Sequence, residues 1–201
     1  KETKYAIRAI PLGGFCNMEG EEERSEESGS FSKASIPKRI AIVAAGAIVN
    51  IIFGIIVYFI LMSCIGMYVG TEDTIINHIK FAGEETGQLF ISLFDSIKQL
   101  FTGKIGVDQM MGPVGISEVV AKTNGISEFL QMMALISISL GITNLLPIPA
   151  LDGGKILILI IETIRRKPMK QETEIGIQML GFAILIGLSL IITYNDILRI
   201  F

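Results

Sequence analysis

The chain has 201 residues, of which 50% are hydrophobic and 18% are charged, with a formal net charge of −3. The mean hydropathy of +0.58 is too high for an ordinary soluble domain. The small negative charge excludes the basic surface that nucleic-acid binding needs, and the spacing of the two cysteines indicates neither a metal-binding pair nor a disulfide framework.

Residues 1–18 are predicted to form a short membrane-associated β-hairpin. Large and small residues alternate from Lys4 to Ile10, and Pro11-Leu12-Gly13-Gly14 supplies a turn. The edge of such a hairpin can pair with an extended peptide, although an incidental surface hairpin would have the same pattern. Residues 19–38 follow as an acidic cytoplasmic loop rich in Glu, Ser and Gly, which we interpret as solvated.

The first predicted transmembrane span covers residues 39–65. No charged side chain occurs from Ile40 to Met62, and a helix of this length measures about 34 Å, enough to cross a hydrocarbon core of about 30 Å. Asn50 lies inside this span and needs a hydrogen-bonding partner there, either as a contact between helices or as part of a polar site. Basic residues place the beginning of the span in the cytoplasm, namely Lys33, Lys38 and Arg39.

Residues 66–126 are predicted to be an extracytoplasmic segment. Apolar residues recur at three- and four-residue steps from Gln88 to Phe101, which predicts an amphipathic helix in the membrane interface. His78 has no second histidine or carboxylate at helical spacing, so we interpret it as a surface residue. Residues 112–116 are predicted to form a stiff turn before the next span.

Residues 127–165 are predicted to be one transmembrane crossing that is broken in the middle. As one straight helix they would measure about 57 Å, far more than a bilayer, whereas two full spans need roughly 40 apolar residues. Pro147 and Pro149 remove backbone donors, and Gly153 and Gly154 allow the chain to turn. We therefore expect a partly unwound helix between Pro147 and Gly154.

Asp152 is the carboxylate within this predicted break. A carboxylate at the bilayer centre costs roughly 2.5–3.5 kcal/mol on insertion scales, and broken backbone is tolerated there only where it is buried in protein or lines a wet cavity. Asp152 is therefore either a metal ligand or a capping residue at a helix break, and residue type and position alone leave both open.

The remaining residues are predicted to form a cytoplasmic loop, 166–174, a last span, 175–194, and a tail, 195–201. A basic cluster places the loop on the same side as the first basic cluster, and it consists of Arg165, Arg166, Lys167 and Lys170. The predicted fold class is mainly α, a multi-pass helical bundle in the plasma membrane with the short N-terminal hairpin attached.

Three patches of the sequence resemble the site-2 protease family of intramembrane zinc metalloproteases, and its bacterial branch in particular. The stretch from Asn144 to Gly154, NLLPIPALDGG, resembles the family's Asn-Xaa-Xaa-Pro…Leu-Asp-Gly motif. The stretch Ile10–Phe15 resembles its membrane-associated β-hairpin. The stretch Arg39–Gly46, with Asn50, resembles the start of its second span, with Ala47 where proline is usual. The tail also fits, through Gly181-Phe182 and Tyr194-Asn195-Asp196-Ile197.

The resemblance implies a role for each matching residue. Asp152 would be one of three protein ligands of a catalytic Zn²⁺, which leaves a position open for water and lowers its pKa towards about 7. The motif's Asn144 would hold the substrate backbone or the developing oxyanion, and Pro147 would also contact the substrate. Asn50, Gly153 and Gly154 would shape the site. The hairpin edge would hold an unwound substrate through Ile10, Gly13 and Gly14. The implied substrate is a single-span membrane protein, of the anti-sigma factor or signal-peptide remnant type.

The sequence departs from the family in one decisive respect. The family's other zinc ligands and its general base lie in a His-Glu-Xaa-Xaa-His motif, which this chain lacks, so no catalytic residue is visible. We therefore expect a partial polypeptide, inactive as given, without the first span and the PDZ domain usual in bacterial relatives. Two alternatives remain: an inactive scaffold that binds substrate helices, and an ion-coupled transporter built around a broken helix.

Overall fold

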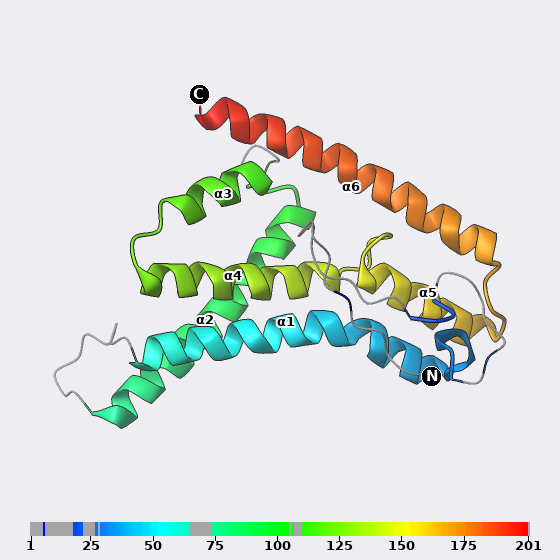
Figure 1. Ribbon diagram of the computed structural model, residues 1–201, viewed down its shortest axis with the longest axis horizontal. Coiled ribbons are helices and arrows are strands. Elements are labelled where there is room, and N and C mark those ends of the chain that lie inside the picture. Colours follow the sequence, from blue (N-terminus) through cyan, green and yellow to red (C-terminus); the bar gives the residue numbers. More distant parts are fainter. Residues whose placement is uncertain are drawn as a thin grey trace. The chain divides into compact units, whose positions relative to one another are not determined.

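The computed structural model describes residues 6, 18–21, 27, 29–64, 74–104, 106 and 110–200. This part of the chain is mainly helical, which confirms the predicted class, and it contains no strand. The predicted β-hairpin falls outside the described residues except at Ala6 and Met18, so it has no support from the structure. The elements, shown in Figure 1, are the 3₁₀-helix η1 (Phe31–Lys33) and the α-helices α1 (Ile36–Cys64), α2 (Ile75–Phe101), α3 (Pro113–Ala121), α4 (Ile126–Asn144), α5 (Asp152–Arg165) and α6 (Gln171–Ile200).

The chain divides into two compact units, Lys1–Arg39 and Ile40–Phe201. In the first unit the ring of Phe31 is buried, and the guanidinium of Arg39 lies 5.0 Å from its centroid. This distance is within the range of a cation–π contact. The second unit contains almost all of the helical structure.

Helices α1 and α4 pack side by side through glycines (Figure 1). A Cβ atom on Gly54 of α1 would lie 2.7 Å from the carbonyl oxygen of Ala134 in α4. A Cβ atom on Gly141 of α4 would lie 2.6 Å from the carbonyl oxygen of Ala47 in α1. Since the later residue of α1 meets the earlier residue of α4, the two helices are antiparallel. Small residues at such a contact let two membrane helices approach closely.

A buried apolar cluster joins α1, α2 and α4. It consists of Tyr58, Leu61, Met62, Ala82 and Ala134. Helix α2 contributes Ala82 to this cluster and packs Phe81 and Leu89 against it, whereas Ile91 and Phe94 in its second half are exposed. The amphipathic pattern was predicted for Gln88–Phe101, whereas the helix extends back to Ile75.

Asp196 of α6 holds the beginning of α3. One of its carboxylate oxygens, Oδ2, accepts hydrogen bonds from the backbone amides of Gly112, at 2.9 Å, and Gly115, at 2.8 Å. Its side chain is 1% exposed, and Pro113 occupies the start of the helix, where a missing amide proton costs nothing. The sequence was expected to form a turn at residues 112–116, so that prediction was wrong: these residues form a capped helix start.

Three helices in the described part of the chain are long and apolar enough to cross a membrane: α1, α4 and α6. Large apolar side chains are exposed along α1 and α6, including Val49, Ile56, Met179, Leu180 and Leu190. Soluble proteins rarely expose continuous apolar surface of this extent, whereas lipid covers it without cost. The chain is therefore a membrane protein.

Candidate functional site

The candidate site is the break between α4 and α5. Helix α4 ends at Asn144 and α5 begins at Asp152. Between them, Pro147 and Pro149 have no amide proton and disfavour helical geometry in the residue before each of them. The break was expected from Pro147 to Gly154; the structure places it earlier, because the two glycines belong to the first turn of α5.

Every amide of the connecting segment finds an acceptor. The first two, of Leu145 and Leu146, continue the hydrogen bonding of α4, and those of Ile148 and Leu151 bond within the segment, at 2.7 Å and 3.2 Å. The remaining amide, of Ala150, donates to the side chain of Gln178 on α6. An amide without a partner costs several kcal/mol in a hydrocarbon environment, so this complete pairing explains how the chain leaves helical geometry here.

Two buried glycines let α5 pack against the segment that precedes it. A Cβ atom on Gly153 would overlap the carbonyl oxygens of Leu145 and Leu146. A Cβ atom on Gly154 would overlap the carbonyl oxygen of Ile148. Any side chain at either position would push α5 away, so both glycines are required by the close approach and not by their backbone angles.

Asp152 is the first residue of α5, and its side chain is half-buried. The amide groups at the beginning of a helix carry partial positive charge, which favours a carboxylate at this position. Asn144, which is also half-buried, ends the preceding helix, and Pro147 between them is exposed. The break therefore gathers most of the predicted site residues: Asn144, Pro147, Asp152, Gly153 and Gly154.

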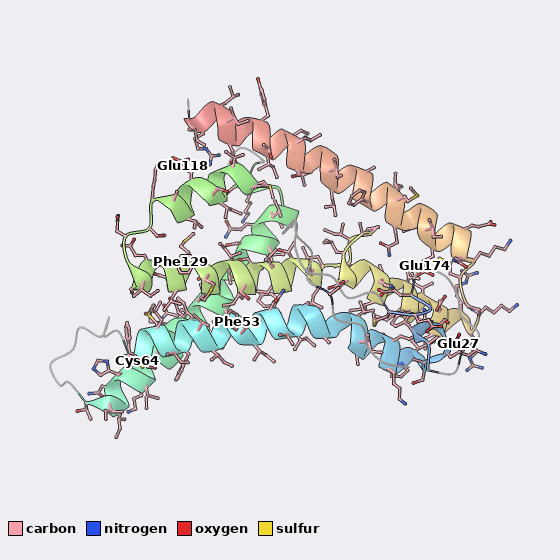
Figure 2. The ribbon with its side chains drawn as sticks, viewed as in Figure 1. Glu27, Phe53, Cys64, Glu118, Phe129 and Glu174 are labelled. Atoms are coloured by element: carbon pink, nitrogen blue, oxygen red, sulfur yellow. The ribbon has the colours of Figure 1, made fainter. Side chains whose placement is uncertain are left out.

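Asn50 lies elsewhere, at the contact between α1 and α4. Its backbone carbonyl accepts a hydrogen bond of 2.8 Å from the hydroxyl of Ser137. This hydrogen bond joins α1 to α4 through the Asn50 backbone, and both predicted roles of the Asn50 side chain stay predictions. Asn50 is one of the residues that line a mainly apolar hollow of about 390 Å³, together with Phe53 and Phe129, which Figure 2 labels on α1 and α4. The three predicted hairpin residues, Ile10, Gly13 and Gly14, lie outside the described residues.

At the break between α4 and α5, the described residues supply one carboxylate that zinc could bind, Asp152, and not a complete set of ligands. No group of three His, Cys, Asp or Glu side chains that could hold a metal ion occurs within the described part of the chain. His78 lies in the first turns of α2 and is half-buried, and its interpretation as a surface residue stays a prediction. A structural zinc site has four protein ligands and a catalytic one has three. Asp152 can thus be one ligand of a zinc site only if other donors complete it.

Gln178 contacts the break and Asp196 holds the neighbouring start of α3, and neither role was predicted from the sequence. A signal was present for Gln178, because it is a polar residue inside a predicted span and must find a partner there. It also precedes Gly181 by three residues, so both lie on one face of α6. That face meets the break, since a Cβ atom on Gly181 would overlap Pro149.

Comparison with known proteins points to one family. The family model "Peptidase family M50" matches residues 1–188. The chain is 41% identical over 132 residues to "Zinc metalloprotease RasP" of Shouchella clausii, a match that covers 65% of this chain and 32% of the relative. It is 42% identical over 139 residues to "Regulator of sigma-W protease RasP" of Bacillus subtilis, covering 68% of this chain and 33% of the relative. The chain spans about a third of the length of these relatives.

Proposed function

This chain belongs to peptidase family M50, and from that premise we propose that it forms part of the active site of an intramembrane zinc metalloprotease. The observation that carries the proposal is the break between α4 and α5, which presents Asp152 at the start of a helix and keeps every connecting amide paired. A carboxylate oxygen is a ligand that zinc accepts in sites with one open position. The activity belongs to the complete protein, in which further donors join Asp152.

The residues at the break have separable roles in this proposal. Asp152 holds one position of the metal, which when bound supplies an activated water. The side-chain amide of Asn144 hydrogen-bonds the backbone of a substrate that has left helical geometry. The substrate pairs as an additional strand with the edge of the proposed hairpin, at Ile10, Gly13 and Gly14, and this pairing keeps the substrate extended.

The proposed substrate is a single-span membrane protein, and the proposed location is the plasma membrane. The break lies between α4, which can span a membrane, and α5, so a substrate reaches it from within the bilayer. The name of the Bacillus subtilis relative, "Regulator of sigma-W protease RasP", supports an anti-sigma factor as the class of substrate. A signal-peptide remnant has the same single-span chemistry and is the second class to test.

The test is cleavage of a single-span reporter by the full-length gene product in membranes. We expect Asp152→Ala and Asp152→Asn to reduce cleavage at least 100-fold, because loss of even an outer-shell partner of a metal ligand typically costs about 10–100-fold. Asp95→Ala is the matched control, since Asp95 is an exposed aspartate on α2.

Membrane fractionation must show equal amounts of each variant. Undiminished cleavage by Asp152→Ala would refute the ligand assignment. A wild-type protein that binds the reporter but leaves it intact would instead favour the scaffold alternative.

A further inference from the structure

The residue two positions before Asp152 has an unusual backbone. Ala150 has φ 74°, in the left-handed region that residues with a side chain rarely adopt. Such a conformation costs of order 1–3 kcal/mol and persists only where the surroundings hold it. Contacts from the surrounding structure must therefore hold Ala150 in this conformation.

The side chain of Gln178 does so. Its Oε1 accepts a hydrogen bond from the amide of Ala150 at 2.5 Å. The neighbouring amides of Ile148 and Leu151 bond to backbone carbonyls of the same segment. Among the amides from Leu145 to Leu151, that of Ala150 is the one that bonds to α6. The two bonded residues are 28 positions apart in the sequence.

A second contact from α6 reaches the same place. Gly181 lies one turn after Gln178 on the same face of α6. Its backbone is so close to Pro149 that a Cβ atom would overlap that residue's carbonyl group and ring. Van der Waals contact at Pro149 and a hydrogen bond at Ala150 therefore fix two consecutive residues of the segment.

We infer that Gln178 is a positioning residue for the proposed metal ligand: its hydrogen bond holds the left-handed turn at Ala150 and thereby directs Asp152. This inference rests on the proposed function. Without the bond, the Ala150 amide has no acceptor in an apolar environment, and rotation about Ala150 would restore one only by moving the start of α5. Asp152 is the first residue to move, since it opens that helix.

Three variants of the full-length protein test the inference. Gln178→Met keeps an unbranched side chain of similar length but has no acceptor strong enough to replace the amide oxygen. Gln178→Glu keeps an oxygen in the same place and should restore the bond. Gln99→Met is the matched control, because Gln99 is an exposed glutamine on α2.

The first measurement is the zinc concentration that gives half-maximal reporter cleavage after removal of metal with a chelator. We expect Gln178→Met to raise it about 10-fold, the lower end of the range for outer-shell partners of metal ligands. Gln178→Glu should stay within about threefold of wild type, and Gln99→Met should not change it.

The second measurement needs no activity. Amide hydrogen exchange of the metal-free protein should show faster exchange of the peptide covering residues 148–154 in Gln178→Met than in wild type, by at least 10-fold, with Gln178→Glu close to wild type. Exchange reports local opening, so it follows the turn even in a variant that has lost zinc.

The outcomes separate this inference from the proposed function. Wild-type zinc dependence in Gln178→Met, or a lower melting temperature with unchanged zinc dependence, would overturn the positioning role. An equal defect in Gln178→Glu would overturn it too, because the retained oxygen should rescue the bond. The proposed function fails on different results: cleavage of the reporter by Asp152→Ala, or a wild-type protein that binds the reporter and leaves it intact.

Discussion

At the scale of single residues, the location of Asp152 depends on two neighbouring glycines, which have no side chain. Gly153 and Gly154 follow it directly, and both press against carbonyl oxygens of the connecting segment. Alanine at either position would have to displace main chain, which cannot rotate away as a flexible side chain can. The position of Asp152 therefore depends on the lack of a Cβ atom at the two glycines. It also depends on the hydrogen bond that Gln178 of α6 accepts from the amide of Ala150.

The role of Gly153 gives a stability prediction. Gly153→Ala should lower the free energy of unfolding by about 3 kcal/mol, since overpacking against backbone costs at the upper end of the usual range. For a chain of this size that corresponds to a melting temperature lower by roughly 6–12 °C in a fixed detergent.

The control for this prediction is Gly187→Ala on α6. A Cβ atom on Gly187 meets nothing within 4 Å, and alanine favours helix over glycine by about 1 kcal/mol. We expect this variant to be as stable as wild type or more so. Equal melting temperatures for wild type and Gly153→Ala would show that α5 can shift without loss.

At the scale of secondary-structure elements, the broken helix was predicted from the sequence, and its limits were not. Pro147 and Pro149 removed two donors and made the break certain to occur near them. The start of α5 at Asp152 depends on contacts of Gly153 and Gly154 with the segment before them. Such contacts form only in the folded protein, and no local pattern in the sequence predicts them.

Other elements show the same limit of sequence reasoning. The apolar periodicity of α2 predicted its second half, whereas its first half is set by packing of Ala82 in the shared cluster. Helix α3 was missed because Gly112-Pro113 is typical of a turn. Its start depends on Asp196, which is 81 to 84 residues away. The spacing of residues in the sequence therefore could not predict that the carboxylate of Asp196 caps α3.

The seam between α1 and α4 gives a prediction for a pair of elements. Gly54→Ala and Gly141→Ala should each cost about 1–3 kcal/mol of unfolding free energy, because a Cβ atom at either position lies within 2.7 Å of an atom of the facing helix. The double variant should lose less than the sum, because helices already forced apart by one methyl accommodate the second more easily.

Thermal or denaturant unfolding of the four proteins in one detergent measures this coupling. Gly46→Ala on α1 is the control, since a Cβ atom there meets nothing within 4 Å. Strictly additive losses would mean that the two contacts relax independently, and that α1 and α4 do not move as rigid rods.

At the scale of the whole molecule, the membrane topology follows from the lengths and charges of the helices. Helices α1, α4 and α6 are long and apolar enough to cross, whereas α5 measures only about 21 Å and ends in a basic cluster. The turn after α5 is compact: Arg166 adopts a left-handed conformation, and buried Glu162 accepts a hydrogen bond from the amide of Met169 at 2.7 Å. We expect this turn to face the cytoplasm.

Cysteine labelling tests that topology. Cys64 is a free, exposed thiol at the end of α1, opposite to the basic residues Lys38 and Arg39 at the beginning of this helix. A membrane-impermeant maleimide should therefore label it in intact cells when Cys16 is replaced by serine. Pro168→Cys, placed in the exposed turn after α5 and combined with serine at positions 16 and 64, should react only after the membrane is permeabilised. Labelling of Pro168→Cys in intact cells would contradict the topology, because it would place the basic turn outside and require the break that holds Asp152 to be entered from the opposite leaflet.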